Sequence, residues 1–158
     1  MKILAPLKGS DEVLPLAEAG AGEFYCGVTP PGWEQAFGQA SVHRRSARAA
    51  GVAGLAELAR IVDLAAGRPV FATLNAPSYP AGAIPRLVGF ARTLVDEAGV
   101  AALIVAELEL VLALREAGLA SRIHVSSLAT CRNPGAAAFF RSLGVSRVIL
   151  PRHVTLAE

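Results

Sequence analysis

The fold of this chain is decided by residues 84–106, IPRLVGFARTLVDEAGVAALIVA. In its first part, apolar side chains recur at the three-and-four spacing of one helix face, at Ile84, Leu87, Val88, Ala91, Leu94, Val95 and Ala98. Gly99 is the residue type that ends helices in the left-handed conformation, and the apolar run 101–106 has the length of a buried strand. The stretch therefore predicts a helix followed at once by a strand.

The same unit recurs along the whole chain. Apolar runs predict strands at 2–5, 23–28, 70–75, 101–106, 122–127 and 147–150. Helical patterns occupy the gaps between them, at 12–19, 55–66, 84–98, 108–117 and 134–144. The Pro/Gly-rich stretch 29–51 predicts a long loop after the second strand. Because one helix separates successive strands, right-handed crossovers make the strands parallel.

Capping residues mark several helix ends. Ser10 or Asp11 is expected to cap the first helix, and Asn133, with Pro134 at the next position, the helix over 134–144. Thr155 has the same capping chemistry and predicts the start of a sixth helix.

Two architectures contain such a repeat, an open doubly wound sheet and a (β/α) barrel. A doubly wound nucleotide-binding domain places a glycine-rich turn after its first strand, whereas the turn here, residues 6–10, holds one glycine. The pattern favours an α/β, TIM-barrel-like fold with about six parallel strands and five to six helices. Since a full barrel takes about 250 residues, residues 1–158 are expected to form a single, incomplete barrel domain, the N-terminal portion of a longer protein.

The composition suits a sheet that is buried on both faces, because 53% of the residues are hydrophobic and 18% are charged. A net charge of +2 gives no global field that favours nucleic acid or a membrane. No apolar run could span a bilayer and no signal peptide is evident, so a cytoplasmic location is expected. The two cysteines, Cys26 and Cys131, argue against a disulfide scaffold or a metal site built from this chain alone.

In a barrel the working side chains lie at the C-terminal ends of the strands. The candidates at these ends are Lys8, Cys26, Asn75, Glu107, His124, Ser126, Ser127, Arg152 and His153. Alternation along the fifth strand puts His124 and Ser126 on one face, where they could serve as base and hydrogen-bonding group. A core histidine is the alternative, and no acid near a strand end supports a Ser-His-Asp triad.

The loop after the second strand carries the basic run His43-Arg44-Arg45-Ser46-Ala47-Arg48. Its guanidiniums could clamp a carboxylate or a phosphate, or they could simply be solvated. As an RNA-binding surface the run is weak, because Trp33 is the only large aromatic residue nearby.

Three further candidates have structural alternatives. Cys26 is expected to be a small buried hydrophobe, whereas Cys131 precedes a helix, where a thiol can become reactive. Glu107 is expected to begin the helix over 108–117, because a carboxylate stabilises a helix N-terminus.

Taken together, several segments resemble peptidase family U32, the collagenase-like proteins. The segments are 2–6 (KILAP), 23–27 (EFYCG), 73–75 (TLN), 123–127 (IHVSS) and 144–152 (GVSRVILPR). They cover most of the chain in order. Two positions depart from the family pattern: Leu128 stands where Gln is usual, and His153 where Glu or Gln is usual.

The resemblance implies a TIM-barrel-like domain and two kinds of activity. The family takes its name from a collagenase-type protease, while other members resemble oxygen-independent hydroxylases that modify tRNA, ribosomal RNA or ubiquinone precursors. Those hydroxylases use a 4Fe-4S cluster, and some use prephenate as oxygen donor. A cluster needs four ligands, usually thiolates, so this chain with two cysteines is expected to hold none and to be inactive alone.

The resemblance also implies site residues. Asn75, His124, Ser126 and Arg152 match the family, and Arg44, Arg45 and Arg48 resemble an arginine-bearing loop of related members. Catalysis is expected from His124 and Ser126, if from any residue here, and contact with a small-molecule or RNA substrate from the others. A third hypothesis is a non-catalytic subunit that pairs with itself or a partner through open sheet edges.

Overall fold

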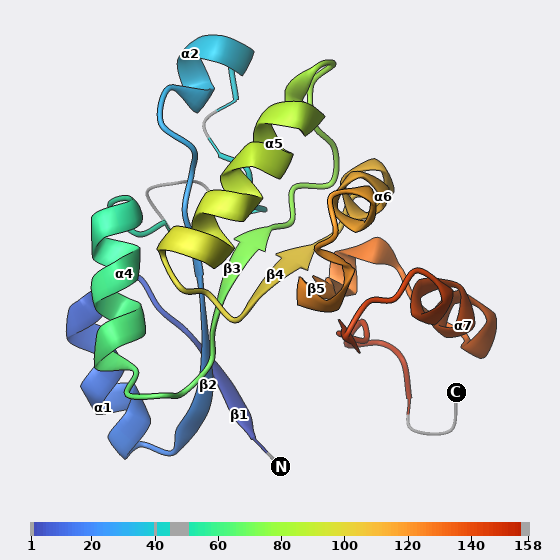
Figure 1. Cartoon of the computed structure of the whole chain (residues 1–158). Coiled ribbons are helices and arrows are strands. Elements are labelled where there is room, and N and C mark those ends of the chain that lie inside the picture. Colours follow the sequence, from blue (N-terminus) through green and yellow to red (C-terminus); the bar gives the residue numbers. More distant parts are fainter. Residues whose placement is uncertain (1, 40, 45–50, 156–158) are drawn as a thin grey trace.

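The structure, a computed structural model, describes residues 2–39, 41–44 and 51–155. Its strands form one sheet in which every neighbouring pair is parallel, in the order β1-β2-β3-β4-β5-β6 (Figure 1). The strands are β1 Ile3–Pro6, β2 Ala21–Gly27, β3 Val70–Leu74, β4 Ala102–Val105, β5 Ile123–Val125 and β6 Arg147–Val148. The predicted α/β, TIM-barrel-like fold is confirmed as a partial barrel.

A helix follows each of the first five strands, as the repeat predicted. The α-helices of the described residues are α1 Val13–Glu18, α2 Trp33–Phe37, α4 Leu55–Leu64, α5 Ala83–Arg92, α6 Leu108–Glu116 and α7 Pro134–Ser142. A π-helical turn, Thr93–Glu97, extends α5, so the predicted helix over 84–98 is one continuous element with a wider last turn. None of the described helices is long and apolar enough to cross a membrane.

The main core lies between the sheet and these helices. On β3, Ala72 and Leu74 point outward into this core, whereas Phe71 belongs to a separate cluster on the opposite, concave face. All five residues of β3 are buried, as expected for a central parallel strand with both faces covered. The concave face is the interior of the partial barrel, and it carries the side chains that matter below.

The concave face is curved enough for strands four places apart to touch. Arg147 on β6 donates two hydrogen bonds to the carboxylate of Glu23 on β2, at 2.7 and 2.9 Å. Three strands lie between them in the sheet. Glu23 is 5% exposed, whereas the Arg147 side chain is 40% exposed, so the ion pair lies at the edge of the barrel interior, near the N-terminal ends of its strands.

Two local predictions were wrong. Neither Ser10 nor Asp11 makes a side-chain cap; residues Ser10–Glu12 form a 3-10 turn instead. The amide of Ser10 donates to Glu57 Oε1 of α4 at 2.7 Å, so a neighbouring helix supplies the acceptor. Strand β6 ends at Val148 rather than at residue 150. By contrast, Asn133 caps α7 as predicted, accepting from the Ala136 amide at 2.8 Å.

The loop after β2 is more ordered than its Pro/Gly content predicted. It contains α2, a helix of five residues, and the structure describes residues 29–39 and 41–44 of it, which we call the strap. Trp33 on α2 is 1% exposed and packs against Phe37 and Tyr79. The sixth helix predicted from Thr155 falls outside the described residues.

Candidate functional site

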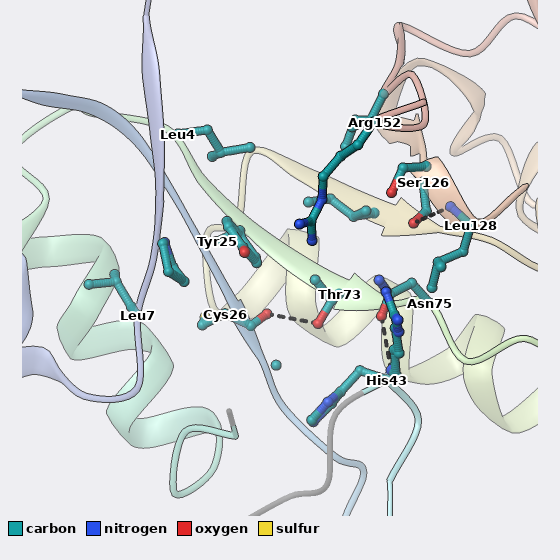
Figure 2. A pocket seen from close by; sticks show the side chains of 16 residues that line it. Leu4, Leu7, Tyr25, Cys26, His43, Thr73, Asn75, Ser126, Leu128 and Arg152 are labelled. Atoms are coloured by element: carbon teal, nitrogen blue, oxygen red, sulfur yellow. Dashed lines mark hydrogen bonds between the residues drawn. The ribbon is translucent and has the colours of Figure 1, made fainter. Parts of the chain in front are cut away.

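A pocket of about 340 Å³ opens on the concave face, at the C-terminal ends of the strands (Figure 2). Leu4 and Pro6 on β1, and Tyr25 and Gly27 on β2, line it at alternate positions, and Cys26 also borders it. This alternation is that of the inward face of a barrel strand. The pocket therefore lies where barrels of this class carry their working residues.

The floor of the pocket is apolar. It is built from Leu4, Tyr25, Ile104 and Ile149, one residue from each of β1, β2 and β4 and one directly after β6. Leu4, Tyr25 and Ile149 are half-buried, so the floor offers apolar surface to a ligand. Tyr25 was not predicted as a site residue; its place on the inward face of β2 is the signal that could have identified it.

The rim of the pocket is polar and positively charged. Arg44, Asn75, Ser126 and Arg152, all predicted site residues, line it together. Figure 2 shows the Arg152 side chain extending over the pocket between Tyr25 and Ser126. No Asp or Glu lines the pocket, and neither guanidinium forms an ion pair with another described residue. No carboxylate of the described residues therefore compensates the charge of the rim.

The position of Arg44 is fixed by Asn75. The backbone N–H of Arg44 donates to Asn75 Oδ1 at 3.2 Å, a contact between residues that are 31 positions apart. The Asn75 side chain thus accepts a hydrogen bond from the loop and also borders the pocket. Arg45 and Arg48, predicted to bind substrate as well, lie outside the described residues.

His43 is a pocket residue that the prediction noted only as part of the basic run. Its imidazole is 5% exposed and packs against the backbone of Gly27. A Cβ atom at Gly27 would lie 2.6 Å from His43 Nε2, so only glycine leaves room for the ring at this close approach. This contact fits the strap, one residue before Arg44, onto the inward face of β2.

His124 lies on the same face of β5 as Ser126, as predicted, but it does not line the pocket. Its ring packs edge-on against Phe71, with centroids 4.5 Å apart. Burial, together with the nearby Arg147 guanidinium, lowers the pKa of His124 to about 4. The imidazole is therefore neutral at pH 7, and its buried Nδ1 makes no hydrogen bond to a described residue.

Ser126 does border the pocket, yet its hydroxyl is already engaged. Ser126 Oγ accepts the Leu128 N–H at 3.3 Å and caps a short 3-10 turn, Ser127–Ala129. Leu128, which replaces the usual family Gln, also lines the pocket. The predicted catalytic roles of Ser126 and His124 stay predictions, since no described base contacts the Ser126 hydroxyl.

The remaining candidates lie elsewhere or are inert. Glu107 caps α6 as predicted, accepting from the amides of Glu109 and Leu110. Lys8 and His153 are exposed and do not line the pocket. Burial raises the pKa of the Cys26 thiol to about 12, so this wall residue stays protonated. Cys131 is 1% exposed, which restricts access to its thiol.

The residues of this chain do not fit an iron-sulfur cluster by themselves. A 4Fe-4S cluster needs four ligands, usually thiolates, and the sequence has two cysteines, both buried and unpaired. The described residues also contain no group of three His, Cys, Asp or Glu side chains that could hold a metal ion.

The model of peptidase family U32 matches residues 10–158. The chain belongs to peptidase family U32. A search of curated proteins finds no match. The matched range contains β2 to β6 and every pocket residue except Leu4, Pro6 and Leu7.

Two solved structures share this fold. One is described as the U32 peptidase Mk0906, with 19% identity and a TM-score of 0.64 over 95% of this chain. The other is described as QR15, an aldolase, with 14% identity and a TM-score of 0.65 over 94% of this chain. The chain spans 58% of the length of the first structure and 67% of the second. At these identities the likeness shows the fold alone.

Proposed function

We propose that this U32 chain supplies the substrate-binding pocket of an enzyme, and that Arg44 and Arg152 bind an anionic group of the substrate. The observation that carries the proposal is the charge at the rim: two guanidiniums border the pocket, and none of the residues that the structure describes brings a carboxylate to it. Guanidinium groups form strong charge-assisted hydrogen bonds with carboxylates and phosphates. The apolar floor would hold the body of the same ligand.

The reaction we propose is the iron-sulfur-dependent hydroxylation that the family resemblance implies, on an RNA or a quinone precursor. Because this chain has two cysteines, the cluster ligands would come from outside these 158 residues. What the described residues contribute is binding and orientation: the rim holds an anionic group and the floor excludes water from the body of the ligand. Residues 1–158 would then be the N-terminal portion of a larger protein.

The anion site can be tested with a minimal probe. Benzoate carries a carboxylate on a planar apolar ring, and benzamide has the same shape without the charge. We expect calorimetry to show benzoate binding at least about tenfold more tightly than benzamide, because a charge-assisted contact contributes about 1.5–3 kcal/mol. Equal binding of the two, or binding of neither, would contradict the anion site.

The reaction class needs a separate test. Anaerobic reconstitution with iron and sulfide, followed by visible absorbance, should give no cluster on this chain and a cluster on a longer protein that contains it. A longer U32 protein that also binds no cluster would count against hydroxylation and leave the pocket assignment untouched.

Peptide hydrolysis is a second candidate, favoured by the family itself and by the solved relative described as a peptidase. Ser126 is the side chain that would serve as nucleophile, although its hydroxyl contacts no described base. Hydrolysis of gelatin that is lost in Ser126→Ala but kept in Ser142→Ala, a change on exposed α7, would favour this candidate.

Pairing through sheet edges is a third candidate. Within the described residues β1 and β6 each pair with one neighbour only, and unpaired strand edges invite association. A chain that scatters light as a monomer at all concentrations would count against this role.

A further inference from the structure

We infer that Tyr79 and Arg86, two residues outside the pocket, are positioning residues: they hold the strap against the barrel and thereby place Arg44 at the pocket rim. The inference deepens the proposed function, because it rests on Arg44 binding the anionic group. It names residues that neither the sequence pattern nor the pocket lining would have selected.

The first half of the strap is held by an aromatic cluster. The Trp33 ring lies 4.5 Å from Phe37 and 6.2 Å from Tyr79, the latter in an edge-on arrangement. The Arg86 guanidinium of α5 lies 5.8 Å from the centre of the Phe37 ring and also donates to the Pro31 carbonyl. Two residues from the β3–α5 segment therefore hold α2 in place.

The second half of the strap is held by hydrogen bonds to the loop after β3. The Val42 carbonyl accepts from the Tyr79 hydroxyl at 2.8 Å and from the Ala76 amide at 3.2 Å. Two residues further along, the Arg44 amide donates to Asn75 Oδ1. The Tyr79 hydroxyl thus holds the backbone two residues before Arg44, and its ring contacts the aromatic cluster of α2.

Docking the strap also has an energetic cost. Thr29 Oγ1, Trp33 Nε1 and Gln39 Oε1 are buried without a hydrogen-bond partner among the described residues. Unsatisfied buried polar groups destabilise a folded arrangement. Because the docked state carries this cost, its population is sensitive to the contacts of Tyr79 and Arg86, which add to the burial of Trp33 and Val42 in the main core.

The chain contains its own reporter for the test. Trp33 is the only tryptophan and is buried in the strap, so acrylamide quenching of its fluorescence measures strap release. Hydrogen exchange of the Arg44 amide, followed by NMR, reports the contact with Asn75. The variants are Tyr79→Phe, which removes one hydroxyl, Arg86→Met, and the two combined.

We expect the double variant to raise the quenching constant of Trp33 by about twofold or more and to speed exchange of the Arg44 amide, with benzoate affinity reduced by about fivefold. Arg86→Lys, which keeps a cation near Phe37, should restore part of the loss. Arg92→Met is the matched control: Arg92 also lies on α5 and donates to a backbone carbonyl, that of Ala117 at 2.8 Å, but touches no strap residue.

Unchanged quenching and Arg44 exchange in the double variant would overturn the inference. So would a released strap with unchanged benzoate affinity. If the wild-type chain binds no benzoate, the anion site fails, while quenching and Arg44 exchange still decide whether Tyr79 and Arg86 hold the strap. Urea unfolding separates strap release from global loss of structure, and Tyr79→Phe alone gives a milder variant should the double variant unfold.

Discussion

The two ends of the concave face differ in whether their arginine side chains are paired with a carboxylate. At the N-terminal ends of the strands, Arg147 and Glu23 neutralise each other through two hydrogen bonds, and Arg147 also lies 5.2 Å from the centre of the Phe71 ring. At the C-terminal ends, Arg44 and Arg152 meet no carboxylate of the described residues. We call these the ion-pair end and the pocket end.

The difference separates stability from binding within one barrel interior. The ion-pair end joins strands that are distant in the sheet and leaves little charge for a ligand. The pocket end keeps its charge available above an apolar floor, at the face where barrel enzymes bind substrates. Substitutions at the first end should therefore change unfolding, and those at the second should change binding.

The largest effect is expected from Arg147→Met. Glu23, 5% exposed, would keep only the exposed Lys2, 3.9 Å away, so the free energy of unfolding in urea should fall by about 2–3 kcal/mol. Benzoate affinity should not change. Arg141→Met, on the exposed side of α7, is the control, and it should change the free energy of unfolding by less than about 0.5 kcal/mol. If Arg147→Met and Arg141→Met lowered the free energy of unfolding equally, the stabilising role of the ion-pair end would be contradicted.

The next effect is a pH dependence that depends on His124. Its pKa is lowered from 6.5 to about 4 by burial and by Arg147, so the unfolded chain binds this proton more readily than the folded chain. Stability from this group is complete above pH 6.5 and is lost as the pH falls toward 4. The carboxyl pKa of Glu23, lowered by its hydrogen bonds with Arg147, acts in the same direction but only below its ordinary value of 4.5.

Urea unfolding between pH 7 and 4 should therefore show a steeper loss for the wild type than for His124→Gln. His153→Gln, which changes an exposed histidine, should follow the wild-type curve. Parallel curves for wild type and His124→Gln would mean that the histidine is not shielded from protonation.

At the pocket end, Arg152→Gln should weaken benzoate binding about tenfold, because one charge-assisted contact is lost. Its free energy of unfolding should equal that of the wild type, since the side chain is exposed and forms no ion pair with a described residue. Arg68→Gln, on the exposed turn after α4, is the matched control. If Arg152→Gln lost stability but still bound benzoate as tightly as the wild type, the assignment of binding to the pocket end would be contradicted.

The smallest effect is expected from Glu107→Ala. Glu107 follows β4 at the pocket end, but its carboxylate caps α6 instead of facing the pocket. Removing the cap should lower the free energy of unfolding by about 1 kcal/mol and leave benzoate binding unchanged. Glu107→Gln, which keeps an acceptor, should recover most of the stability; weaker benzoate binding in either variant would show that Glu107 belongs to the site.

The fold could be predicted because its signals are local. Helix periodicity, the Gly99-type helix end and short apolar runs each lie within one β/α unit, and they located every strand of the sheet to within a few residues. Helix α2 was not predicted, because its five residues show no periodicity. It contacts Tyr79 and Arg86, which belong to the next β/α unit along the chain.

The site could be predicted only in part for the same reason. Strand alternation correctly put His124 and Ser126 on one face, and strand ends indicated Asn75 and Arg152. Depth along the barrel axis is not encoded in alternation, so the sequence left His124 open between a base of the site and a core histidine, and the structure buries it outside the pocket lining. The Arg147–Glu23 pair joins residues 124 positions apart, and only the curvature of the folded sheet brings them together.

The most direct test of the two-ended barrel is an NMR titration of the wild-type chain with benzoate, with benzamide as the neutral reference. We predict that benzoate alone shifts the amide signals of Arg44, Thr73, Ser126 and Arg152 at the pocket end, while those of Glu23, Phe71 and Arg147 stay in place. Shifts centred on the ion-pair end, or equal shifts with benzamide, would contradict the account.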